Sequence, residues 1–75
     1  MKIQEKFGLT IRELRQKKNI SQEKLALDAG IDRTYIGDIE KGTRNVSIEV
    51  VEKLANYFQM PISELFIIIE SKENE

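Results

Sequence analysis

The 75-residue chain contains no cysteine, no histidine and no tryptophan, and only one proline. Without cysteine it has no disulfide and no thiolate ligand for a metal. Without histidine it lacks the commonest metal ligand and the usual general base, and its acidic residues are scattered along predicted helix surfaces. We therefore expect no metal, no cofactor and no enzymatic activity.

Long apolar runs are also absent. No run approaches the roughly 18 residues that a membrane-spanning helix needs, and residues 1–6 lack the apolar stretch of a signal peptide. The sequence thus predicts a cytoplasmic protein that makes no membrane contact.

The composition is 40% hydrophobic and 33% charged, with only four glycines. These values favour one compact, mostly helical domain, which we place at residues 1–69, followed by a frayed acidic tail at residues 70–75. A chain of this length buries only about 60% of its unfolded surface. Association with a second copy is a common way to supplement such marginal stability.

The net charge of −1 conceals a gradient along the chain. Residues 1–20 carry six basic and two acidic side chains, residues 21–46 carry four and five, and residues 47–75 carry two and six. A protein that binds a polyanion usually has a basic excess. Here such an excess can only be local, on one face of the domain.

Helix start and stop signals divide the chain into five predicted helices. Ser21, Asp32 and Ser47 are good N-cap residues, and Gly30 and Gly42 are good stops. Apolar residues at helical spacing predict the core-facing stripes: Phe7, Ile11 and Leu14; Leu25, Ala26 and Ala29; Tyr35, Ile36 and Ile39; Val51, Leu54, Ala55 and Phe58; and Leu65 in a helix that begins around Pro61. The run at residues 67–69 is β-branched, but a lone strand has no partner, so we expect it to be helical or irregular.

The second and third predicted helices are separated by very few residues. A small residue, Ala26, is positioned for a close crossing of the two helices, and Gly30 provides the positive φ of the turn. Five apolar positions anchor both helices to the core: Leu25, Ala29, Ile31, Ile36 and Ile39. This pattern is typical of a helix-turn-helix, which leaves the outer face of its second helix free to enter a DNA groove.

At residues 11–15, 20–26, 30–31 and 36–42 the sequence resembles the Xre/Cro-type helix-turn-helix family, and the likeness extends over about residues 6–66. Residues 32–36, followed by Arg44 and Asn45, are similar to the controller proteins of restriction-modification systems. The resemblance implies an all-α, five-helix, phage-repressor-like domain with the helix-turn-helix at its second and third helices. It also implies a homodimer on a near-palindromic operator that represses transcription, activates it, or does both.

The exposed face of the third helix should read DNA bases. The candidates are Arg33, Thr34, Tyr35 and Asp38. Arg33 suits the bidentate contact to guanine, and Asp38 suits the amino group of cytosine. The alternatives are that Tyr35 packs against the first helix and that Asp38 is an ordinary surface charge. Gly37 lies mid-helix, either because a side chain there would hit DNA or as a neutral surface glycine.

Other residues should contact the DNA backbone. The predicted phosphate contacts are Gln22, Lys41, Thr43, Arg44 and Asn45. Gln22 lies beside the free N–H groups of a helix start, which favour anions, although it could instead be an extra cap. The cluster of Arg12, Lys17 and Lys18 could contribute electrostatically. The resemblance implies a structural role for Arg15 and Glu40, as an ion pair that joins the first helix to the third.

Five apolar residues near the C-terminus cannot all face inward from one short helix. Ile62, Phe66, Ile67, Ile68 and Ile69 are therefore the predicted dimer interface. Two-fold pairing there would place the recognition helices about 34 Å apart, one turn of DNA. The alternative is a core that extends further around this helix. No segment is left for an effector domain, so we expect no small-molecule effector.

Two other functions fit the same fold. One is a protein-interaction module that has lost DNA binding, which the slightly acidic net charge of −1 favours. The other is an antitoxin-type repressor of its own operon. The combination of Gln22, Arg33, Arg44 and Asn45 favours DNA binding over the interaction module.

Overall fold

The computed structural model describes residues 1–72, and within this range the only regular secondary structure is helical. It consists of α1 (Ile3–Lys17), α2 (Gln22–Ala29), α3 (Arg33–Lys41), α4 (Ile48–Tyr57) and α5 (Ile62–Glu70). The predicted all-α, five-helix fold is confirmed, and the run at residues 67–69 is helical. None of the helices that the structure describes is long and apolar enough to cross a membrane.

The predicted helix boundaries of the helix-turn-helix follow from side-chain caps and left-handed glycines. The hydroxyl oxygen of Ser21 accepts a hydrogen bond from the Lys24 N–H at 3.0 Å. The Asp32 carboxylate accepts one from the Thr34 N–H at 2.8 Å. Gly30 and Gly42 end α2 and α3 with φ of +71° and +77°, which glycine adopts without strain. These local signals confirm the predicted turn between the two helices.

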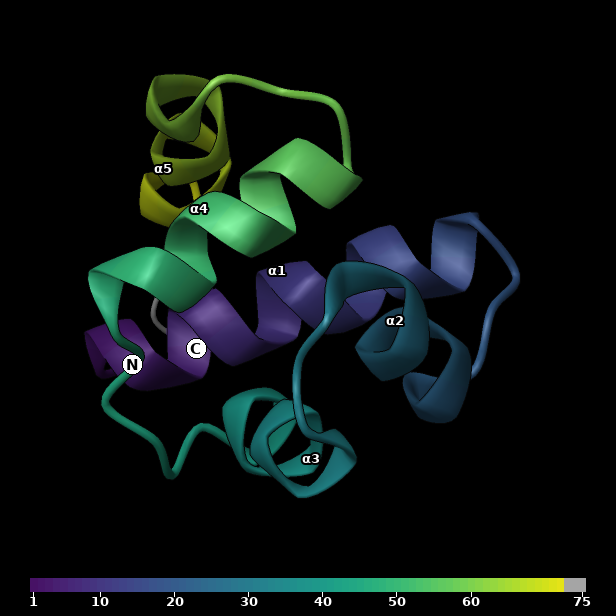
Figure 1. The fold of residues 1–75 in the computed structure, drawn as a ribbon. Coiled ribbons are helices and arrows are strands. Elements are labelled where there is room, and N and C mark those ends of the chain that lie inside the picture. Colours follow the sequence, from purple (N-terminus) through teal and green to yellow (C-terminus); the bar gives the residue numbers. More distant parts are fainter. Residues whose placement is uncertain (73–75) are drawn as a thin grey trace.

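The core lies around α1, which runs through the middle of the molecule with α3 on one side and α4 and α5 on the other (Figure 1). Helix α2 packs against α3 and α4. The buried apolar side chains are Phe7, Ile11, Leu25, Ala26, Ile31, Ile36, Ile39, Val51, Leu54, Ala55, Leu65 and Ile69. All five helices contribute to this single cluster, so the helix-turn-helix is held by the rest of the domain.

Helices α1 and α3 approach each other backbone to backbone at Gly8. A Cβ atom built on Gly8 would lie 2.0 Å from the carbonyl oxygen of Ile39, where no real side chain fits. The absence of a side chain at this position therefore sets how close α3 lies to α1. This contact fixes the orientation of the helix that the sequence assigns to DNA recognition.

The C-terminal end of the described chain is held by local contacts. Glu70 belongs to α5, and the Ser71 hydroxyl donates to the carbonyl oxygen of Ile68 at 2.6 Å. The Lys72 ammonium pairs with the Glu13 carboxylate of α1. A helix end and an ion pair thus involve residues 70–72 of the predicted tail, and its residues 73–75 lie outside the described residues.

Candidate nucleic-acid interface

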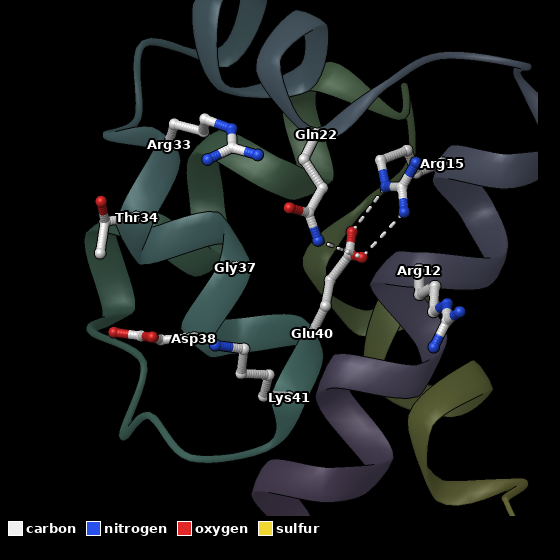
Figure 2. Close-up of a pocket in the computed structure, with 9 residues that line it drawn as sticks. All are labelled: Arg12, Arg15, Gln22, Arg33, Thr34, Gly37, Asp38, Glu40 and Lys41. Atoms are coloured by element: carbon white, nitrogen blue, oxygen red, sulfur yellow. Dashed lines mark hydrogen bonds and ion pairs between the residues drawn. The ribbon is translucent and has the colours of Figure 1, made fainter.

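A shallow groove runs along the outer face of α3, between this helix and the adjoining parts of α1 and α2 (Figure 2). Its lining residues are Arg12, Arg15, Gln22, Arg33, Thr34, Gly37, Asp38, Glu40 and Lys41. The groove is polar and strongly charged. Eight of these nine residues, all except Gly37, are ones that the sequence predicts to touch DNA or to support such contacts, and they therefore lie together here.

Arg33 and Thr34 occupy the first turn of α3, directly after the Asp32 cap. Both side chains are exposed and project from the helix surface (Figure 2). The opposite face of α3 is buried through Ile36 and Ile39. The start of α3 thus presents an arginine and a threonine outward, as major-groove recognition requires.

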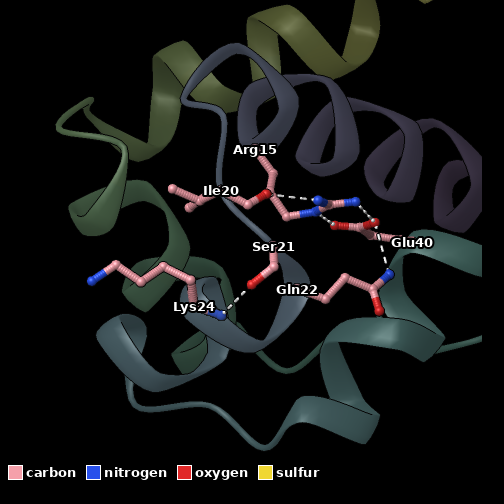
Figure 3. A network of polar contacts seen from close by, with 6 residues as sticks. All are labelled: Arg15, Ile20, Ser21, Gln22, Lys24 and Glu40. Atoms are coloured by element: carbon pink, nitrogen blue, oxygen red, sulfur yellow. Dashed lines mark hydrogen bonds and ion pairs between the residues drawn. The ribbon is translucent and has the colours of Figure 1, made fainter.

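Glu40 is the centre of a hydrogen-bond network that joins α1, α2 and α3 (Figure 3). Arg15 donates to its two carboxylate oxygens from Nε at 2.7 Å and from Nη2 at 3.0 Å. Arg15 also donates from Nη1 to the carbonyl oxygen of Ile20 at 2.8 Å. The bonds to Glu40 raise the pKa of the Arg15 guanidinium. Arg15 and Glu40, with side chains 14% and 5% exposed, thus form the ion pair that the resemblance implies.

Gln22 has a role in this network that the sequence did not show. Its side-chain Nε2 donates to the Glu40 carboxylate at 3.0 Å, which ties the start of α2 to the end of α3. A contact to DNA phosphate would therefore use the amide oxygen of Gln22 or require the side chain to rotate. Nothing in the local sequence of α2 indicates this partner, because Glu40 is 18 residues away.

A second cluster forms around Tyr35 in the first turn of α3, which contacts the loop that follows the helix. The Ser47 backbone N–H donates to the Tyr35 hydroxyl at 3.2 Å and lowers its pKa. The Arg44 guanidinium carbon lies 4.2 Å from the centre of the Tyr35 ring, and Arg44 pairs with Asp38 at 3.6 Å. Tyr35 and Asp38, both predicted to read bases, therefore also hold Arg44 next to the groove.

Of the remaining predicted backbone contacts, Lys41 lines the groove, whereas Thr43 and Asn45 lie in the loop after α3. The Thr43 hydroxyl donates to the carbonyl oxygen of Asp38 at 3.3 Å, and the Asn45 side-chain oxygen accepts from Gln4 at 2.7 Å. Lys41 is exposed at the C-terminal end of α3, where it lines the groove. Thr43 and Asn45 thus have intramolecular partners that order the loop after α3.

The predicted basic cluster of α1 is divided by the structure. Arg12 lines the groove, whereas Lys18 lies over the Tyr57 ring, 5.5 Å from its centre. Lys17 lines a separate hollow with Glu13 and Gln16. Of this cluster, Arg12 alone belongs to the candidate interface.

Four of the five residues of the predicted dimer surface on α5 are at least partly exposed in the single chain. Ile67 is 65% exposed and Ile62 is 40% exposed, whereas Phe66 and Ile68 are half-buried. Ile69 is fully buried, because it follows Leu65 by four residues and so shares its inward face. We therefore correct the predicted interface by assigning Ile69 to the core.

The arrangement of α2, a glycine turn and an outward-facing α3 defines the helix-turn-helix class. A model of the helix-turn-helix family matches residues 11–65, and the chain belongs to this family. The sequence-based resemblance is thus confirmed.

Controllers of restriction-modification systems are prominent among the similar proteins. The control protein C.BamHI of Bacillus amyloliquefaciens is 54% identical over 50 residues, which span 65% of this chain and 62% of that protein. The restriction-modification controller protein C.AhdI of Aeromonas hydrophila is 48% identical, with a TM-score of 0.78 over 84% of this chain and 96% of that one. The controller C.Esp1396I, a tetramer in complex with its natural 35 base-pair operator, is 28% identical, with a TM-score of 0.82 over 93% of this chain and 92% of that one. The match thus covers less than two thirds of C.BamHI but nearly all of the two controller structures.

Proposed function

We propose that this protein is a transcriptional regulator that binds double-stranded DNA sequence-specifically, as a homodimer on a near-palindromic operator. Its particular role would be the control of a restriction-modification system. The observation that carries the proposal is the outward placement of Arg33 and Thr34 at the start of α3. In this role the protein acts by binding rather than by catalysis, in the cytoplasm, where its operator lies.

The charges of the groove explain how a protein with a net charge of −1 could bind DNA. Each carboxylate in the groove has a cationic partner, because Arg15 neutralises Glu40 and Arg44 pairs with Asp38. Arg12, Arg33 and Lys41 have no ion-pair partner within residues 1–72. The groove therefore presents an excess of positive charge, which favours the phosphate backbone.

In the proposed complex α3 enters the major groove and Arg33 forms the bidentate contact with guanine O6 and N7. Tyr35 and Asp38 hold the Arg44 guanidinium against α3, where a phosphate contact would fix the register of the helix. Tyr35 and Asp38 thus contribute through Arg44 as well as through any base contact of their own.

Replacing Arg33 by alanine should weaken binding to the operator by about 5- to 150-fold, because a bidentate base contact contributes about 1–3 kcal/mol to discrimination. The operator is obtained by selecting the DNA that wild-type protein binds from the region upstream of its gene, and affinities follow from fluorescence anisotropy at fixed salt. Arg33 is exposed, so the variant should unfold at the wild-type temperature.

The matched control is Arg12→Ala on the rim of the same groove. Loss of a phosphate or long-range contact should weaken binding to all duplexes equally. It should also reduce the slope of log affinity against log salt concentration by about 1. The proposed function fails if wild-type protein binds every duplex equally, or if Arg33→Ala and Arg12→Ala show the same sequence-independent loss.

Replacing Ile67 by glutamate should convert the dimer to monomers, because a carboxylate would be buried in the apolar patch of α5. Ile67 is 65% exposed in the single chain, so the helix itself should tolerate the change. Light scattering after size exclusion gives the mass, and circular dichroism checks the fold. The control is Leu27→Glu, because Leu27 is 79% exposed on α2, outside the proposed interface. A dimer that survives Ile67→Glu would contradict this interface.

A further inference from the structure

The fold itself accounts for three of the four glycines in the chain. Gly8 leaves room for the carbonyl oxygen of Ile39, and Gly30 and Gly42 adopt positive φ at helix ends. Any other residue at these positions would be strained or would clash. The fourth, Gly37, has neither explanation.

Gly37 lies in the middle of α3 with ordinary helical geometry. A Cβ atom built on it would meet only the side-chain oxygen of Gln22, at 3.9 Å, which is normal van der Waals contact. Glycine in a helix interior destabilises the helix relative to alanine. The free protein therefore gains nothing from glycine at this position.

The position of Gly37 suggests what does require it. Gly37 lies four residues after Arg33 and four before Lys41, so the three share one face of α3, and all three line the groove. Figure 2 shows the bare ribbon at Gly37 between the side chains of Gln22 and Asp38. No side chain therefore covers the surface of α3 at the middle of the helix, where Gly37 lines the groove.

We propose, on the basis of the proposed DNA-binding function, that Gly37 is a specificity-determining residue. In the complex the edge of a base pair packs against the backbone of α3 at Gly37, in the space that a Cβ atom would fill. This close approach sets the depth of α3 in the major groove, and that depth brings Arg33 and Thr34 within reach of the base edges.

The experiment compares Gly37→Ala with wild-type protein in two measurements. The first is thermal unfolding at one protein concentration, where the Tm should rise by about 4 °C because the helix loses a destabilising residue. The second is anisotropy at fixed salt on the operator selected by wild-type protein and on a scrambled duplex. Affinity for the operator should fall by about tenfold or more, as for a lost base contact, and affinity for the scrambled duplex should change less than about twofold.

The control is Gln16→Ala on the exposed surface of α1, which does not line the groove of α3. It should leave both affinities unchanged. The inference is overturned if Gly37→Ala binds the operator as tightly as wild-type protein does. It is also overturned if the variant binds both duplexes more weakly by the same factor, as a clash with phosphate would cause, or if its Tm falls. Failure of the proposed function itself is distinct, because wild-type protein would then show no preference for any operator.

Discussion

Replacing Glu40 by alanine is expected to lower the free energy of unfolding by about 3–5 kcal/mol, since truncation of one partner of a largely buried ion pair strands the other. Glu40 accepts two hydrogen bonds from Arg15 and one from Gln22, and its side chain is 5% exposed. Without it the Arg15 guanidinium stays largely buried and retains only its bond to the Ile20 carbonyl oxygen. Urea denaturation followed by circular dichroism measures the loss.

The same helix provides a matched control in Asp38→Ala. Asp38 also pairs with an arginine, but both side chains of that pair are partly exposed. Solvent screens such pairs, so the change should stay within about 1 kcal/mol of zero. If Glu40→Ala and Asp38→Ala have equally small effects, the network at Glu40 does not hold α1, α2 and α3 together.

Replacing Gly8 by alanine is expected to destabilise the protein at the upper end of the range of about 1–3 kcal/mol for overpacked cores, or beyond it. The added Cβ atom would lie 2.0 Å from the Ile39 carbonyl oxygen, which is backbone and cannot rotate away. Helices α1 and α3 would have to separate, which would also displace Arg33 and Thr34. We therefore expect a lower midpoint in urea together with weaker binding to the operator.

Gly37→Ala is the natural comparison for Gly8→Ala, because both place a methyl group within a helix. The two variants should change stability in opposite directions, since a Cβ atom at Gly37 has open space and one at Gly8 does not. A Gly8→Ala protein as stable as the wild type would show that α1 and α3 are not in backbone contact.

The local features of the fold were predictable from sequence because they depend on neighbours in the chain. Ser21, Asp32 and Ser47 cap their helices, and Gly30 and Gly42 end theirs, through contacts within a few residues. Such contacts need only short-range patterns. The same holds for the core stripes, which repeat with the period of a helix.

Contacts between distant segments of the chain were harder to predict from the sequence. The bonds from Gln22 to Glu40 and from Arg44 to Asp38 and Tyr35 depend on how the helices are oriented, and charge patterns along the chain do not specify this. The burial of Ile69 is different, because the spacing alone indicates it. Leu65 is predicted to face the core, and Ile69 follows it by four residues, so the two share one face of the helix.

Methylation protection of guanine N7 on the selected operator tests the central proposal most directly, because N7 lies in the major groove, where Arg33 would bind it. We expect wild-type protein to protect guanines in two symmetry-related patches about 10 base pairs apart, and Arg33→Ala to lose that protection while Arg12→Ala keeps it at saturating concentration. Bound wild-type protein that leaves every guanine N7 reactive, or protection that persists in Arg33→Ala, would contradict recognition of the major groove by α3.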